Sequence, residues 1–257
     1  MPIKHNQAKP VPASAVRVWR GFKDPQLATP KFFQDLGQIF VPATVELQWQ
    51  QGLDAYIPSF PAGKNKPATV PDETAVLFWD SQLAYKNGFN TLAIRTYSLT
   101  HNGVYNTQNK ISTADFPGPY ADSLVADQSY FFFNKAIDWM QGTVFHLVGG
   151  RPAKQKPAQF ISALNKWAQD FYTNNPDKAA GAIICASNNY VLFWECIPKA
   201  KKAGKGMAAL AKLCEVYHNK AAKPQSLAGG LFDNWMGLNV KPGDSYNMQF
   251  SRRDITD

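Results

Sequence analysis

Apolar positions recur along the chain with two periods, that of a strand and that of a helix. Residues 15–22 mix β-branched and aromatic residues with two arginines, which is typical of a half-exposed strand. Residues 29–40 begin with Thr-Pro and then place Phe, Leu and Ile at spacings of three and four, the pattern of an amphipathic helix. Two apolar strands are predicted at 53–60 and 74–80, followed by a helix over 81–101 that an Asn-Gly pair interrupts.

The second half of the chain repeats this order of elements. An Asn-Asn-Pro sequence ends its first helix, and Ser187-Asn188-Asn189 between two apolar runs is a hairpin signal. The predicted elements are strands at 143–148, 180–186 and 190–195, helices at 157–172 and 198–218, and a last strand between Gly230 and Val240.

Short sequence repeats support two copies of one unit. Residues 76–80 read Val-Leu-Phe-Trp-Asp, and residues 191–195 read Val-Leu-Phe-Trp-Glu. A Pro-x-x-Phe step at 30–33 recurs at 157–160, an offset of 127 residues (157 − 30). Repetition on this scale indicates tandem units, and strand-helix-strand-strand-helix-strand is the ferredoxin-like order. The closing strand of the first unit has no clear pattern and is expected somewhere in 103–121.

The repeats divide the chain into four parts. Residues 1–14 are expected to form a flexible arm. Residues 15–126 are predicted to be the first ferredoxin-like repeat, in which 102–126 is a long loop without periodicity. Residues 127–141 are predicted to be a connecting helix, and residues 142–257 the second repeat.

The repeated strand is apolar on both of its faces. Val76 and Phe78 point to one side of the strand, and Leu77 and Trp79 point to the other. Such a strand needs a helix against one face and a second apolar layer against the other. The predicted fold class is therefore α+β, with two tandem ferredoxin-like repeats whose antiparallel sheets pair into one pseudo-twofold barrel around a cavity.

This organisation resembles the dimeric α+β barrel superfamily, which includes antibiotic-biosynthesis monooxygenases, EthD-like proteins and stress-responsive barrel proteins. The resemblance covers most of residues 15–101 and 142–240, and it rests on the element order and the repeated Phe-Trp-acid ending. It implies a barrel cavity that holds a small molecule, and cofactor-independent monooxygenase, cyclase or isomerase activity. Haem binding, known in related barrels, is implied as an alternative. No motif carries the family's catalytic residues onto this chain.

Composition narrows the classes of partner. With 257 residues, of which 45% are apolar, the chain can bury a substantial core. Residues 1–128 hold 11 Lys/Arg and 10 Asp/Glu, so residues 129–257 hold 16 (27 − 11) and 9 (19 − 10) and carry most of the net charge of +8. This imbalance permits an anionic ligand. The lysines at 199–212 have no aromatic platform or recognition-helix pattern beside them, so a solvated helix face is favoured and nucleic acid is not expected.

Three cysteines without a Cys-x-x-Cys pair predict neither a disulfide framework nor a zinc site. The N-terminus lacks the apolar segment of a signal peptide, and no run of about 18 apolar residues occurs. No membrane association is therefore expected. The expected location is cytoplasmic, and the expected state is a monomer or homodimer.

His101 and His218 are the candidate catalytic residues, because each is predicted to end a repeated helix with an Asn after it. A His at the mouth of a cavity can move protons near neutral pH. A purely structural His in the last helical turn would instead interact with the free carbonyls and the helix dipole. Both interpretations stay open at this point.

Several aromatic residues and a third His are candidates for the walls of the cavity, although large aromatics are equally common in cores. They are Trp19, Trp79, Tyr97, His146, Trp194 and Tyr217. Asp80 and Glu195 each follow a strand and precede a helix, so they are expected to act at helix N-termini, with general-base catalysis as the alternative.

The predicted function is binding of a small apolar or aromatic metabolite in the barrel, with or without its transformation by cofactor-independent proton-transfer or oxygenase-type chemistry. Whether the chain is an enzyme stays open. One alternative is a non-catalytic interaction protein with a filled barrel, and another is a haem-binding barrel protein with His146 as a candidate ligand. No cofactor and no metal site are predicted.

Overall fold

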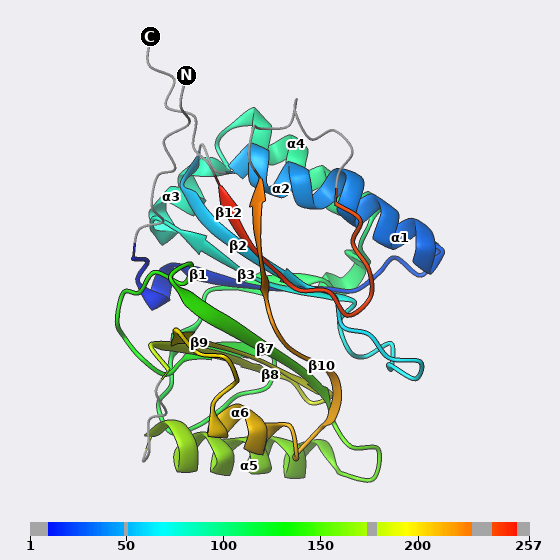
Figure 1. Cartoon of the computed structure of the whole chain (residues 1–257). Coiled ribbons are helices and arrows are strands. Elements are labelled where there is room, and N and C mark those ends of the chain that lie inside the picture. The colour runs from blue at the N-terminus through cyan, green and yellow to red at the C-terminus, as the bar shows by residue number, and fades with distance from the viewer. Residues whose placement is uncertain (1–9, 49–50, 174–178, 228–237, 251–257) are drawn as a thin grey trace.

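The computed structural model describes residues 10–48, 51–173, 179–227 and 238–250. Two six-stranded sheets lie face to face, and each sheet carries helices on its outer face (Figure 1). This arrangement confirms the prediction of an α+β protein. Within the described ranges, no helix combines the length and the apolar character that crossing a membrane requires.

The first sheet is built around β1 and β3, which pair antiparallel along six residue positions. The strand β4 pairs antiparallel with the free side of β1, and β2 pairs antiparallel with β3. From edge to edge the sheet contains β11 (Lys223–Leu227), β12 (Tyr246–Phe250), β2 (Leu53–Ser59), β3 (Glu73–Trp79), β1 (Val16–Gly21) and β4 (Thr113–Asp115). β4 lies within residues 103–121, the interval in which a further strand is expected.

The second sheet has the same arrangement around β7 and β9, which pair antiparallel along nine positions. From edge to edge it contains β10 (Glu215–Ala221), β7 (Gly142–Gly150), β9 (Tyr190–Pro198), β8 (Gly181–Ala186), β6 (Gln128–Phe131) and β5 (Gly118–Pro119). The predicted hairpin at Ser187–Asn189 joins β8 to β9.

Helices cover the outer face of each sheet. Over the first sheet lie α1 (Thr29–Asp35), a π-helical turn (Leu36–Phe40), α2 (Val41–Gln48), α3 (Gln82–Gly88) and α4 (Leu92–Thr100), and over the second lie α5 (Pro157–Ala168), a π-helical turn (Gln169–Thr173) and α6 (Lys205–Leu210). Short 3₁₀ turns occur at Ala13–Ala15, His101–Gly103 and Gln108–Lys110. Phe32, Leu36 and Phe40 pack on the first sheet, as their spacing predicts.

The space between the sheets is filled by apolar side chains from both of them. Val76 and Phe78 of β3 meet Leu192 and Trp194 of β9 in one buried cluster. Burial of this cluster away from water stabilises the pairing of the two sheets. Each outer face forms a separate core with its own helices.

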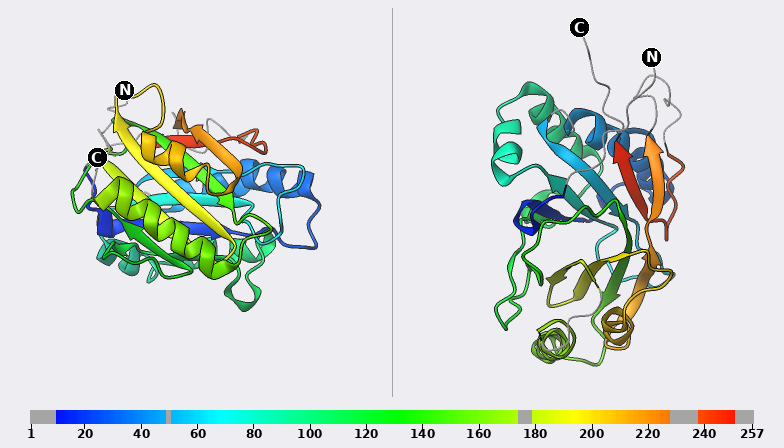
Figure 2. Two further views of the ribbon diagram at one scale, coloured as in Figure 1. Left: turned by 90° about the horizontal axis from the view of Figure 1, so that it is seen from below. Right: turned by 60° about the vertical axis from the view of Figure 1, so that its left-hand side comes forward.

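Each sheet also receives strands from the other half of the chain. After β10, at the edge of the second sheet, the chain crosses directly into β11 at the edge of the first sheet. Figure 2 shows β11 and β12 side by side at that edge. Conversely, β5 and β6 precede residue 142 in sequence and lie in the second sheet. The two sheets are therefore linked by exchanged strands as well as by the core between them.

The repeated pentapeptide does not occupy equivalent faces in the two sheets. Trp79 packs against the helices that cover the first sheet, whereas Trp194 lies between the sheets. The sequence alignment of 76–80 with 191–195 is therefore out of register by one residue, and a shift of one residue reverses every side chain of a strand.

Two predicted helices are wrong. Residues 127–141 contain β6 rather than a connecting helix, because the aromatic side chains of Tyr130 and Phe131 suit a strand that pairs with β8. The helix predicted over 198–218 is confined to α6, and its second part forms β10. That strand lies at a sheet edge with most of its residues exposed, so its polar composition resembles a solvated helix. The strand predicted between Gly230 and Val240 falls largely outside the described residues.

Candidate functional site

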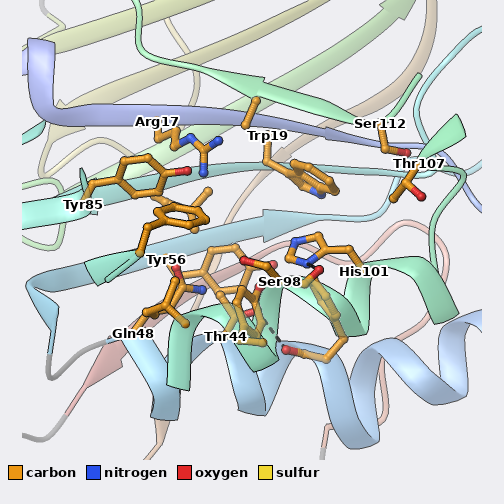
Figure 3. Close-up of a pocket in the computed structure, with 16 residues that line it drawn as sticks. Arg17, Trp19, Thr44, Gln48, Tyr56, Tyr85, Ser98, His101, Thr107 and Ser112 are labelled. Atoms are coloured by element: carbon orange, nitrogen blue, oxygen red, sulfur yellow. Dashed lines mark hydrogen bonds between the residues drawn. The ribbon is translucent and has the colours of Figure 1, made fainter. Parts of the chain in front are cut away.

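A cavity of ≈ 230 Å³ lies on the outer face of the first sheet, beneath α2 and α4 (Figure 3). Its floor includes Arg17 and Trp19 of β1 and Tyr56 of β2. These strand residues reach the cavity because alternate positions of β1 point away from the core between the sheets. The cavity is therefore on the helix side of one sheet, and the predicted position between the two sheets is instead occupied by side chains.

The helical wall owes its position to side-chain caps and to one buried hydrogen bond. Thr91 Oγ1 accepts a hydrogen bond from the backbone nitrogen of Ile94 at 3.3 Å and begins α4. The hydroxyl groups of Thr44 in α2 and Tyr97 in α4 lie 2.6 Å apart and join the two helices. Because Thr44, Ile94 and Tyr97 all line the cavity, these contacts determine its shape.

His101 follows α4 and closes one end of the cavity. Its Nδ1 lies 3.1 Å from the backbone oxygen of Ser98, so Nδ1 carries the hydrogen and Nε2 carries the lone pair. Burial lowers the pKa of His101 to about 4, so the ring is neutral at pH 7. Its ring meets Phe40 and Tyr97 edge-on, with centroid distances of 4.8 and 5.0 Å.

Arg17 occupies the opposite end of the cavity from His101 (Figure 3). Its guanidinium carbon lies 4.1 Å from the centre of the Tyr85 ring and 5.9 Å from that of Phe116. These distances are those of cation–π contacts. Burial lowers the pKa of Arg17 from its ordinary value, but a guanidinium keeps its charge at neutral pH.

Glu73 is buried directly behind the aromatic floor. Its carboxyl group accepts hydrogen bonds from Trp19 Nε1 at 3.0 Å and from the Tyr56 hydroxyl at 2.5 Å, and a third from the Tyr105 hydroxyl. Burial raises the pKa of Glu73, while these three hydrogen bonds lower it. Glu73 is not among the site residues predicted from the sequence, although an acid that opens an otherwise apolar strand is a signal of a buried carboxyl group.

The structure separates the predicted site residues into two groups. Trp19, Tyr97 and His101 line the cavity together. Trp79 belongs to the same helix-side core, and Tyr217 packs at the edge of the core between the sheets.

His146, His218 and Trp194 form a second group, between the sheets. The rings of His146 and Trp194 stack at 4.3 Å with an angle of 3°, and the His218 ring lies 5.2 Å from that of His146. His218 is on β10, so the prediction that His101 and His218 end equivalent helices is wrong.

The residues around His146 do not fit a haem. The His146 ring is fully buried, with one face against Trp194, and its Nε2 lies 3.5 Å from Thr74 Oγ1. A haem ligand needs a ring nitrogen that faces an open slot for the macrocycle. Among the described residues, no group of three or more His, Cys, Asp or Glu side chains could hold a metal ion.

Asp80 and Glu195 do not form a pair of matched carboxylates. Asp80 is exposed after β3, and the next residue, Ser81, caps α3 by accepting a hydrogen bond from Ala84 N at 3.0 Å. Glu195 lies inside β9 and is fully buried. It accepts hydrogen bonds from Tyr172 at 2.9 Å and from Gly204 N, the residue before α6, at 2.6 Å.

Comparisons with known proteins identify no family. No family model matches the chain, and no curated protein matches it significantly. Solved structures that overlap it include a proposed monooxygenase from Fusobacterium nucleatum subsp. nucleatum, with 10% identity over 88% of this chain and 98% of that chain and a TM-score of 0.34.

Two further structures overlap to a similar extent. A proposed monooxygenase from Lactobacillus acidophilus is 7% identical over 79% of this chain and 82% of that chain, with a TM-score of 0.30. An anthrone oxidase-like protein is 10% identical over 82% of this chain and 95% of that chain, with a TM-score of 0.34. TM-scores this low establish no shared fold, so these names do not indicate what the present chain does.

Proposed function

We propose that the chain binds a small apolar or aromatic molecule in the cavity beneath α2 and α4 and transforms it by proton transfer to His101. The observation that carries this proposal is the geometry of His101. Its Nδ1 is held by the Ser98 carbonyl, and its neutral ring stands among aromatic side chains that line a cavity. A fixed tautomer with a lone pair on Nε2 is what a general base requires.

The chemistry follows from the burial of His101. Its low pKa keeps the imidazole ready to accept a proton at pH 7 but makes it a weak base in the empty cavity. Removal of a proton from the bound molecule creates an anion beside the new imidazolium. The attraction between these opposite charges offsets the cost of burying the charged ring. The anion can then be reprotonated at another atom, which is isomerisation, or react with O₂, which is oxygenase-type chemistry. Neither route needs a nucleotide cofactor.

The proposed fold behind this site is a tandem pair of ferredoxin-like units. Support comes from the strand orders β4-β1-β3-β2 and β10-β7-β9-β8, which agree when the strands of each half are counted in sequence. The residues that line the proposed cavity all belong to the first unit. The second unit packs against the other face of the first sheet and supports it.

Proton transfer can be tested without knowledge of the natural substrate. A library of one- and two-ring aromatic ketones and phenols is screened for a rise in melting temperature, and the binders are incubated in D₂O with the protein. Ligand at 100 times its dissociation constant adds about 2.7 kcal/mol of stability. Mass spectrometry then measures deuterium incorporation at acidic C–H positions.

We expect His101→Gln to bind the same molecules but to exchange deuterium at least about 100-fold more slowly. His218→Gln is the matched control, because His218 is remote from the cavity, and it should exchange at the wild-type rate. The proposal is wrong if no member of the library stabilises the protein, or if His101→Gln exchanges as fast as the wild type.

A second candidate is a non-catalytic interaction protein. The observation that favours it is the filled space between the sheets, in which Leu192 and Trp194 are fully buried. If no member of the ligand library raises the melting temperature, this interpretation is favoured.

A further inference from the structure

The geometry points to a carboxylate, or a similar planar anion, as the group of the bound molecule that Arg17 recognises. This inference rests on the proposed function, because it takes the cavity to be a ligand site. It adds the substrate class, namely small aromatic or apolar acids.

The first reason is the position of Arg17. Its side chain extends from β1 into the cavity, and the rings of Tyr85 and Phe116 lie within cation–π distance of the guanidinium. Tyr85 also forms a side-chain hydrogen bond with Arg17. A guanidinium carries five N–H donors in a planar fork, so donors remain for a ligand. Such a fork of donors matches the two oxygens of a carboxylate.

The second reason is the balance of charge around the cavity. Among the described residues, no carboxylate lies within ion-pair distance of Arg17. The acid on the neighbouring strand, Asp115, pairs instead with Arg20 at 2.8 Å. Glu73 is engaged by Trp19, Tyr56 and Tyr105. Arg17 is therefore a sheltered cation whose neighbours are aromatic rings, and an anionic ligand would supply the missing counter-charge.

The third reason is the distribution of polar groups between the ends of the cavity. Arg17 lies at one end and His101 at the other, with Trp19 and Tyr56 between them (Figure 3). A ligand whose carboxylate meets Arg17 would place its ring on the aromatic floor and its far edge toward His101. The volume of ≈ 230 Å³ is below the roughly 300–1,000 Å³ of sites for drug-sized molecules, so one or two rings fit.

The inference is tested with three probes of nearly equal shape. 1-Naphthoate, 1-naphthamide and 1-naphthylmethylammonium differ in charge but share the same ring system. Titration calorimetry with the wild-type protein should show that 1-naphthoate binds at least about tenfold more tightly than the amide. The ammonium should bind more weakly than either. Because this comparison uses the native chain, it does not depend on the folding of any variant.

A pair of variants assigns the preference to Arg17. Arg17→Met should bind the acid and the amide with similar affinity, since it keeps side-chain length but lacks the charge. Arg95→Met is the control, because Arg95 is exposed on α4, and it should keep the preference. Equal affinity of the wild type for acid and amide would overturn this inference and leave the proposed function standing. Failure of all three probes to bind would overturn both.

Discussion

At the level of single residues, the most unusual group is the carboxyl of Glu73. It is fully buried, and its hydrogen-bonding partners are neutral side chains: Trp19, Tyr56 and Tyr105. Burial disfavours the charged form and raises the pKa, so the protonated carboxyl is favoured in the folded chain relative to the unfolded one. Stability from this group is fully present below the ordinary pKa and is lost as pH rises toward the raised value.

Substitution of Glu73 should separate its charge from its hydrogen bonds. Glu73→Gln keeps a hydrogen-bonding group of the same shape, and we expect it to remove this pH dependence with little loss of stability. Glu73→Ala leaves two buried tyrosine hydroxyls and the half-buried Trp19 indole without an acceptor and should cost at least about 2–3 kcal/mol. Urea denaturation of both variants at several pH values measures the effect. Equal destabilisation by Gln and Ala would contradict it.

His218 gives the opposite dependence on pH. Burial lowers its pKa to about 4, and neither ring nitrogen has a hydrogen-bonding partner among the described residues. Because the unfolded chain binds a proton near pH 6.5, stability is complete above that pH and falls as pH drops toward 4. The wild type should therefore lose about 3 kcal/mol of stability at acid pH through His218, and His218→Phe should not show this loss.

The acid loss is measured by thermal melts between pH 7 and pH 4. Asn219→Gln, an exposed change beside His218, serves as the control and should follow the wild-type curve. The neighbouring His146 also has a pKa well below its ordinary value, so part of the acid loss should persist in His218→Phe. A curve for His218→Phe that coincides with that of the wild type would show that His218 is not neutral in the fold.

At the level of elements, α4 connects local sequence to the cavity. It presents Ile94, Tyr97 and Ser98 to the cavity and begins at the Thr91 cap. We expect Thr91→Ala to cost about 1 kcal/mol and to weaken binding of the aromatic probes, because the first turn that carries Ile94 loosens. Thr91→Ser should retain both properties. Thr96→Ala, an exposed change in the same helix, controls for helix propensity. Melting curves measure the stability of these variants, and titrations measure their affinity for the probes. Equal stability and equal affinity of Thr91→Ala and Thr91→Ser would contradict this role of the cap.

Elements also explain where the sequence pattern misleads. The strand β10 reads as a helix because exposed polar residues at a sheet edge carry no alternating apolar pattern. The long interval 102–126 has no periodicity because β4 and β5 contain only three and two residues. Such short strands are specified by their partners rather than by their own composition.

At the level of the whole molecule, the core between the sheets is shared by both halves of the chain. Leu192 is fully buried in it, opposite residues of the first sheet. Leu192→Ala should cost roughly 2–5 kcal/mol, through lost burial and the space it leaves. The whole chain should still unfold in one transition, since exchanged strands and the common core couple the sheets.

Denaturation followed by tryptophan fluorescence and by circular dichroism tests this coupling. Both probes should report the same denaturation midpoint for the wild type. In Leu192→Ala the midpoints from both probes should be lowered by the same amount. Leu99→Ala is the control, because that side chain is 68% exposed, and it should shift the midpoint little. Two separated transitions would show that the sheets unfold independently.

The local order of residues determined much of the secondary structure: the apolar strands β1, β2, β3, β7, β8 and β9, the helices α1 and α5, and hence the α+β class. Periodicity suffices for these elements because each buries an apolar face. The same information brought Trp19, Tyr97 and His101 forward as candidates, and all three line the cavity.

Only the tertiary structure decided which face each strand presents, and therefore where the cavity lies. Trp79 and Trp194 each end the same Val-Leu-Phe-Trp sequence. A difference of one residue in register nevertheless points Trp79 toward the helices and places Trp194 between the sheets. The roles of Arg17 and Glu73 depend on partners far away in sequence, such as Tyr85 and Tyr105. Whether a buried charge has a partner depends on distances between residues in the folded chain. Periodicity along the sequence gives no information about those distances.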